Sequence, residues 1–250
     1  MRERVEAVRT ADGPMPTFVT EPEEGGPYPA VILFMDAPGL REELRDIARR
    51  LGTVGYRVLL PGLFHRDGNP SFDPDRLASH GPDAEMMRLN RELTHARCLA
   101  DTAALLAALA PDGPVATVGY CMGARHALAA AGAFPDRVAA MASLHGGFQV
   151  TGGPDSAHLA LRHARAECYF GFADSDPLTP PEHQATLAEA CRRHGVPARF
   201  EVHPGTTHGF TFPTRHCHDK PAAERVWERL FALLARRLPR PQSSTVRSSA

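Results

Sequence analysis

The sequence predicts an α/β protein in which helices cover both faces of a mainly parallel sheet. Apolar, β-rich runs alternate with helical patterns through most of the 250 residues, which is the order that β-α-β units produce. A Gly-x-Cys-x-Gly segment at residues 119–123 directly follows one such run, as expected where a strand turns sharply into a helix. Hydrophobic residues make up 43% of the chain, enough for one domain over residues 1–238.

The strands are predicted from short β-rich runs. Residues 5–8 and 17–20 flank the turn-forming pair Asp12-Gly13, so we expect an opening hairpin. Parallel strands are then expected at residues 30–35, 56–60, 115–120, 138–144, 168–172 and 199–203.

The helices are predicted from apolar residues at helical spacing. We expect them at residues 41–53, 90–109, 122–133, 181–194 and 222–237. In the last, Val226, Leu230 and Leu233 would bury one stripe. The tail at 239–250 is rich in Pro, Ser and Arg, and we expect it to be disordered.

One predicted connection is unusually long and runs from residue 64 to about residue 88 through several Gly and Pro residues. It leaves the carboxyl end of a strand, where open α/β sheets bind ligands. Two interpretations stay open for it: a wall of the substrate pocket, or a solvated surface loop.

The charge balance restricts the possible partners. Lys plus Arg number 28 and Asp plus Glu number 29, so the chain lacks the positive field that favours nucleic acid or anionic membranes. Residues 1–6 are charged, and no apolar run reaches the length of a membrane span. We expect a cytoplasmic protein with a small-molecule substrate and with neither a nucleic-acid nor a membrane partner.

The five cysteines include no Cys-x-x-Cys pair, which argues against a disulfide framework and against a zinc site. We therefore expect reduced thiols and no metal. Cys98 and Cys168 lie in apolar segments and are predicted to pack in the core, while Cys191 falls late in a helix and Cys217 in a histidine-rich loop.

Cys121 is the candidate nucleophile. Gly119 and Gly123 remove side chains where the strand must turn into the helix, so that the cysteine can stand exposed. The Met122 amide would open that helix, where free N–H groups and the helix dipole favour a thiolate and an oxyanion. Small residues around a buried cysteine also suit simple packing, so the motif needs partners elsewhere in the chain.

Those partners follow in the order nucleophile, acid, histidine. Asp174 and Asp176 come after the predicted strand at 168–172, and His208 comes after the strand at 199–203. We expect His208 to be the base, because the alternatives fit this order less well: His203, His216 and His218. Both aspartates satisfy the order; Asp176 is preferred, and the other would stabilise the loop.

Together these residues resemble the dienelactone hydrolase family of the α/β-hydrolase superfamily over residues 30 to 238. The similarity rests on FMDAPG (34–39), GYRVLLPGLF (55–64), GYCMG (119–123), DSD (174–176) and HGF (208–210). It implies an α/β-hydrolase fold, a triad of Cys121, Asp176 and His208, and hydrolysis of an ester or lactone without metal or organic cofactor.

The resemblance also implies roles around the nucleophile. Asp36 stands where relatives carry a carboxylate that interacts with the resting thiol, although aspartate is shorter than their glutamate and is also common in turns. Ala37 could supply a second oxyanion N–H beside that of Met122.

Two departures leave the substrate open. Relatives bind a substrate carboxylate with arginines, one of them soon after the histidine, and Arg215 is late for that role. Arg66, Arg88 and Arg91 are alternatives or surface charges. Gly62 replaces an aspartate common in relatives.

The working hypothesis is therefore attack by Cys121 on an ester or lactone carbonyl through an acyl-thioester. Two other functions stay open. A glutamine-amidotransferase-like hydrolase usually carries His-x-Glu, whereas Gly209-Phe210 follows His208. A catalytically silent α/β-hydrolase module that binds a ligand or protein partner is the other, because fold alone does not determine function.

Overall fold

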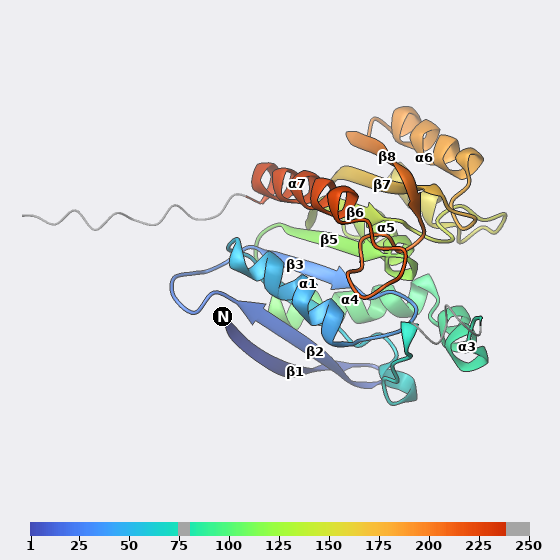
Figure 1. The fold of residues 1–250 in the computed structure, drawn as a ribbon. Coiled ribbons are helices and arrows are strands. Elements are labelled where there is room, and N and C mark those ends of the chain that lie inside the picture. Colours follow the sequence, from blue (N-terminus) through green and yellow to red (C-terminus); the bar gives the residue numbers. More distant parts are fainter. Residues whose placement is uncertain (75–80, 239–250) are drawn as a thin grey trace, which may run out of the picture.

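A sheet of eight strands forms the centre of the computed structural model, which describes residues 1–74 and 81–238 (Figure 1). Its order is β1-β2-β4-β3-β5-β6-β7-β8, and from β4 to β8 the neighbours are parallel. The hairpin β1-β2 joins antiparallel to β4. The strands are β1 (Arg2–Thr10), β2 (Gly13–Glu21), β3 (Ala30–Phe34), β4 (Arg57–Pro61), β5 (Val115–Tyr120), β6 (Val138–Leu144), β7 (Glu167–Ser175) and β8 (Ala198–Thr207).

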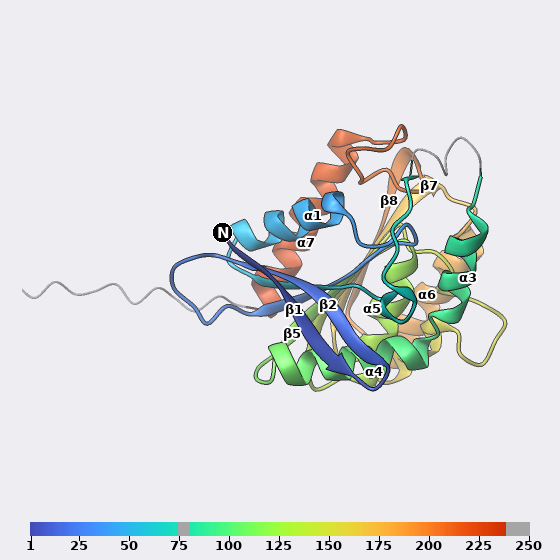
Figure 2. The ribbon, with the colours of Figure 1, turned by 90° about the horizontal axis from the view of Figure 1, so that it is seen from below.

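Helices cover both faces of this sheet. Figure 2 shows α1 and α7 on one face and α4, α5 and α6 on the other. Arg50 of α1 pairs with Glu224 of α7 at 2.5 Å, which joins the two helices of the first face. The helices are α1 (Glu42–Thr53), α3 (Ala84–Glu92), α4 (His95–Leu109), α5 (Met122–Ala133), α6 (Pro181–His194) and α7 (Lys220–Arg237), with 3₁₀ turns η1 (His65–Asp67) and η2 (Ala157–Arg162).

The central strands β3 and β5 are buried at every residue. Strands covered by helices on both faces have no solvent side, which explains why their sequences are nearly continuous apolar runs rather than alternating ones. The predicted α/β-hydrolase fold is confirmed by this sheet and its helix layers.

Some predicted boundaries were wrong. The single helix expected at 90–109 is two helices, because Thr94 accepts a hydrogen bond from the Arg97 N–H and caps the start of α4. β7 and β8 extend past their predicted ends to Ser175 and Thr207, because they continue to pair with each other beyond an irregularity near Ala173. The predicted tail at 239–250 and residues 75–80 of the long connection lie outside the described residues.

The carboxyl ends of the parallel strands meet at one edge of the sheet, and they position the candidate site. Asp36 follows β3, Cys121 follows β5, His145 follows β6, Asp176 follows β7 and His208 follows β8. This edge is where open α/β sheets bind their ligands. Across residues 1–74 and 81–238, none of the helices is both long and apolar enough to cross a bilayer.

Candidate active site

Cys121 occupies a sharp turn between β5 and α5. Its backbone has φ 50° and ψ −114°, a conformation that costs a residue other than glycine about 1–3 kcal/mol. Two hydrogen bonds hold the turn: the Cys121 N–H donates to the Leu144 carbonyl at 3.1 Å, and the Cys121 carbonyl accepts from the Gly147 N–H at 3.1 Å. The end of β6 and the loop that follows it therefore both support the strained residue.

The glycines of this turn are required by close backbone packing. A Cβ on Gly119 would lie 2.2 Å from the Gly123 carbonyl oxygen, and a Cβ on Gly123 would lie 2.4 Å from the Phe34 carbonyl oxygen. Neither contact could be relieved by turning a side chain, because both partners are backbone atoms. The start of α5 thus lies directly against the end of β3.

His208 and Asp176 form a hydrogen-bonded pair beside this turn. Nδ1 of His208 lies 2.7 Å from Oδ2 of Asp176, whose side chain is 1% exposed. The other oxygen, Oδ1, accepts the Leu178 N–H at 2.9 Å, which fixes the carboxylate. Asp174 is exposed instead, and its Oδ2 accepts the Gly205 N–H at 2.9 Å.

Electrostatics favour a charged thiol next to a charged imidazole. Burial raises the pKa of Cys121, but the charge of the neighbouring His208 outweighs burial and lowers that pKa, with Arg215 acting in the same direction and Asp36 against it. Burial lowers the pKa of His208, but the Cys121 thiolate and the Asp176 hydrogen bond raise it by more than burial lowers it, to about 10. Nε2 of His208 forms no well-aligned hydrogen bond with the described residues, as is common in resting enzymes.

His145 is a residue of this edge that sequence reasoning missed. Its backbone φ is 36°, its ring is fully buried, and its centroid lies 5.1 Å from that of His208 in an edge-to-face contact. Nε2 lies 2.8 Å from Oγ1 of Thr211. Burial, followed by the charges of His208 and Arg215, holds the pKa of His145 well below its usual value. The sequence did contain a signal for this residue: His145 directly follows the strand predicted at 138–144, as Asp176 and His208 follow theirs.

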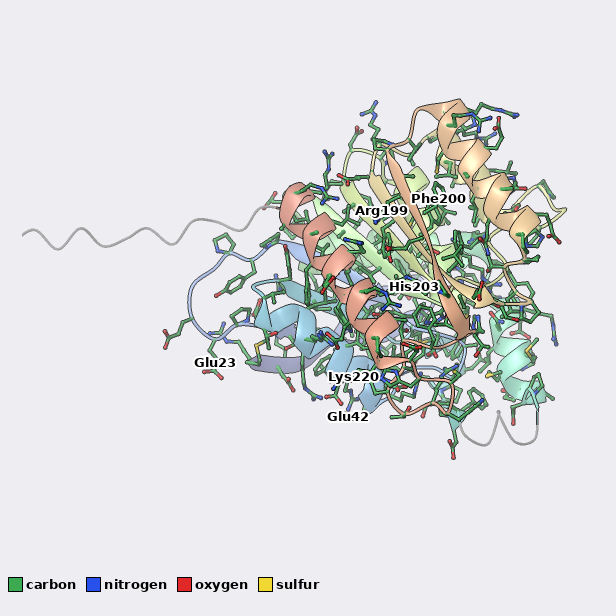
Figure 3. The ribbon with its side chains drawn as sticks, turned by 45° about the horizontal axis from the view of Figure 1, so that its top comes forward. Glu23, Glu42, Arg199, Phe200, His203 and Lys220 are labelled. Atoms are coloured by element: carbon green, nitrogen blue, oxygen red, sulfur yellow. The ribbon has the colours of Figure 1, made fainter. Side chains whose placement is uncertain are left out.

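The other candidate histidines contact other groups or solvent. His203, labelled in Figure 3, lies within β8 beside α7 and contacts the Tyr169 hydroxyl at 3.3 Å. Nδ1 of His218 lies 3.0 Å from the Phe210 carbonyl, and His216 is exposed.

Asp36 is placed next to two arginines. Its carboxylate is fully buried, and its oxygens accept hydrogen bonds from Arg41 and Arg215. The nearer Arg41 contact measures 2.5 Å and the Arg215 contact 2.6 Å. Arg215 reaches this position because consecutive turns fold the segment after Gly209 (φ 89°) back toward the sheet. Its distance along the sequence therefore does not remove it from the site.

The remaining candidate arginines differ in their partners. Arg66 bonds to both oxygens of Asp101 at 2.8 Å, and Arg88 bonds to three surface carboxylates. Arg91 is exposed and lines a cavity of about 120 Å³ together with Arg125.

This cavity lies about one helical turn beyond Cys121, the candidate nucleophile. Arg125 follows Cys121 by four residues, and the thiolate's charge acts on its guanidinium. Arg125 donates to the backbone and side-chain oxygens of Asn90 at 2.7 and 2.8 Å. Asp155 also lines the cavity, so it carries charges of both signs.

The predicted oxyanion donors come from adjacent segments. Met122 is the first residue of α5, where N–H groups have no partner within the helix. Ala37 is buried just after β3, and the glycine contacts above place the end of β3 against this end of α5. Among the described residues, no group of three or more His, Cys, Asp or Glu side chains is arranged to hold a metal ion.

Comparison with known proteins gives a consistent result. The profile of the dienelactone hydrolase family matches residues 15–238. A Methylorubrum extorquens protein with the provisional name carboxymethylenebutenolidase is 28% identical over 88% of this chain and 76% of its own length. An Escherichia coli protein with the same provisional name is 26% identical over 87% of this chain and 80% of its own length.

Solved structures share the fold. A Klebsiella pneumoniae protein, provisionally named a dienelactone hydrolase, superposes with a TM-score of 0.82 at 23% identity, over 94% of this chain and 98% of its own. A dienelactone hydrolase-like promiscuous phosphotriesterase from metagenomic libraries superposes with a TM-score of 0.76 at 24% identity, over 95% of this chain and 99% of its own.

Proposed function

The chain belongs to the dienelactone hydrolase family, and we propose that it hydrolyses a carboxylic ester or lactone with Cys121 as nucleophile, His208 as acid and base, and Asp176 as the residue that orients His208. The observation that carries this proposal is the 2.7 Å contact between His208 and Asp176 beside a cysteine held in a strained turn. This is the arrangement of an activated nucleophile, its base and an orienting acid.

In the first half of the proposed reaction, Sγ of Cys121 attacks the carbonyl carbon. The carbonyl oxygen gains the negative charge, and the amides of Met122 and Ala37 would donate to it, each contributing about 3–4 kcal/mol to the barrier reduction. The C–O bond to the leaving group then breaks. The leaving oxygen takes the proton from Nε2 of His208, so that an alcohol or ring-opened hydroxyl departs and an acyl-thioester remains.

In the second half, water replaces the thiol. His208, now neutral, accepts a proton from water as the water oxygen attacks the thioester carbonyl. The C–S bond breaks, the carboxylic acid product leaves, and the thiolate and imidazolium are restored. Asp176 keeps the proton on Nδ1 throughout, so that Nε2 always faces the reacting atoms.

We propose that the cavity beside Arg125 receives one portion of the substrate. It is small, at about 120 Å³, and it contains both charged and aliphatic side chains, so a small acyl or alcohol group fits it better than a long apolar chain. Replacing Arg125 by Met should raise KM more than it lowers kcat if this is its role.

The test is a hydrolysis screen of lactones and short activated esters, with Cys121→Ala as the blank. Rapid quenching of wild-type reactions followed by mass spectrometry should show an acyl group on the peptide that contains Cys121. Cys217→Ala is the matched control, because this second thiol is partly exposed and donates to the His208 carbonyl at 3.3 Å. Activity that survives Cys121→Ala but is lost in Cys217→Ala would refute the assignment.

A further inference from the structure

The Asp36 carboxylate is held by two arginines, so neither of its oxygens is free to bond to the thiol. Arg41 bonds to both of its oxygens, at 2.5 Å for Oδ1 and 3.2 Å for Oδ2, and Arg215 bonds to Oδ2 at 2.6 Å. The Asp36 side chain is fully buried, while those of Arg41 and Arg215 are 13% and 17% exposed. Two charge-assisted contacts shielded from water are strong interactions.

The same cations belong to a closed network between two segments, the loop that leads into the first turn of α1 and the loop before α7. Arg41 also pairs with Glu43 at 2.6 Å, and Glu43 accepts the N–H and hydroxyl of Thr214 at 3.1 and 2.6 Å. Thr214 precedes Arg215, which returns the network to Asp36. Figure 3 shows the first residues of α1 and α7, Glu42 and Lys220, on the same side of the molecule, where these loops meet.

Contacts with an aromatic ring and with a glycine also fix the positions of the two arginines. The Phe212 ring contacts both of them, with its centroid 5.1 Å from the Arg41 guanidinium carbon and 4.5 Å from that of Arg215. Arg215 also packs along Gly209, next to His208, where a Cβ would lie 3.0 Å from its Nη1. Arg215 is therefore positioned within the segment that carries the catalytic histidine.

The consequence concerns which group holds the thiol proton. Both oxygens of Asp36 already accept hydrogen bonds from guanidinium groups, so a thiol could bond to Asp36 only in competition with the two arginines. Asp36 forms no hydrogen bond with Cys121 in the described residues; its oxygens face arginines instead. The charged or titratable groups around the thiol are Asp36, Arg125, His145, His208 and Arg215. Among those that could take the thiol proton, the oxygens of Asp36 are bonded to arginines and Nε2 of His145 to Thr211, which leaves His208.

We propose that Arg41 is a positioning residue that locks Asp36 to Arg215, so that Asp36 does not gate the thiol and the proton of Cys121 resides on Nε2 of His208 before substrate binds. This inference deepens the proposed function and rests on it. It differs from the role that the family resemblance implies for Asp36, in which the carboxylate interacts with the resting thiol.

The experiment measures the rate at which iodoacetamide alkylates Cys121 across pH in the substrate-free, full-length protein, with each peptide followed by mass spectrometry. Wild type should already react selectively at Cys121 at neutral pH. In Arg41→Gln, Asp36 keeps one cation instead of two, so its negative field at the thiol increases. The half-maximal pH should then rise by about one unit, which makes alkylation about tenfold slower at any pH below both midpoints.

Three further variants separate this role from a loss of structure. Asp36→Asn combined with Arg41→Gln should bring the profile back to that of wild type or below it, whereas simple damage would add to the first defect. Arg41→Lys keeps the positive charge but cannot bond to both Asp36 oxygens in the same way, so it should raise the half-maximal pH by less than Arg41→Gln does. Arg45→Gln, on the same helix in an exposed pair with Glu42, should leave the profile unchanged.

Two results would overturn the inference: a wild-type thiol that alkylates like an ordinary cysteine until substrate is added, or an Arg41→Gln profile that matches wild type in a protein shown by circular dichroism to be folded. Failure of the proposed function is a separate result. In that case Cys121 would alkylate as expected, yet no ester or lactone would be hydrolysed.

Discussion

Replacing Asp176 by asparagine removes one negative charge behind His208 while keeping the size of the side chain. The contact is 2.7 Å long and the aspartate side chain is 1% exposed, so solvent screens it little. A hydrogen bond to a charged group is worth about 1.5–3 kcal/mol. Since one pKa unit corresponds to about 1.4 kcal/mol, the pKa of His208 should fall by about 1–2 units.

The sign of the effect on activity follows from the direction of the His208 shift. The thiolate–imidazolium pair exists above the lowered pKa of Cys121 and below the raised pKa of His208. Losing the Asp176 charge lowers the upper limit, so the decline at alkaline pH should move toward neutrality. Because a fall of about 1–2 units from about 10 still leaves His208 protonated at neutral pH, the loss of kcat/KM should appear on the alkaline side, where it should reach at least tenfold and up to about 100-fold.

The assay is the pH dependence of kcat/KM for an activated ester, measured from about pH 5 to pH 10. Asp174→Asn is the matched control, because Asp174 is exposed and bonds to the Gly205 N–H; it should change the rate by less than about twofold. The reasoning is refuted if Asp174→Asn loses more activity than Asp176→Asn, or if Asp176→Asn retains the wild-type rate and pH limits.

Three other predictions concern packing and the remaining thiols. Gly119→Ala should lower the free energy of unfolding by more than about 2 kcal/mol in urea titrations, because its Cβ would lie 2.2 Å from a carbonyl oxygen; Gly152→Ala, with no atom within 4 Å, should have little effect. Thr94→Ala should cost about 1 kcal/mol in the same titrations because it removes the cap of α4; an unchanged midpoint would contradict that role. At neutral pH, iodoacetamide should label Cys121 first in peptide mapping, since burial raises the pKa of the three buried thiols, and equal labelling would count against an activated Cys121. Those three are Cys98, Cys168 and Cys191.

Local sequence signals predicted much of the fold. The helix bounds 122–133 and 181–194 and the strand bounds 115–120 and 138–144 match the structure, because glycine, proline and apolar runs mark their ends. The break between α3 and α4 was missed because apolar spacing continues across it and Thr94 is an ordinary residue out of context. Its capping role depends on the backbone around it, which spacing does not describe.

The site was predicted only in part, for a physical reason. Chain order indicated Cys121 and His208, and the structure brings Asp176 rather than Asp174 against His208. The Asp36–Arg215 contact joins residues 179 apart, and nothing in local composition specifies which of many arginines will reach a given carboxylate. Arg215 was considered too late in the sequence because the turns after Gly209 that fold it back could not be foreseen.

The strained backbone of Cys121 has a consequence for how this sequence would change over generations. At φ 50° and ψ −114°, the backbone conformation costs cysteine about 1–3 kcal/mol more free energy than it would cost glycine. That difference is a large share of the margin that keeps a typical protein folded. If the proposed chemistry is what retains a side chain there, a descendant that no longer needs the reaction should drift toward glycine at this position and gain stability as it loses activity.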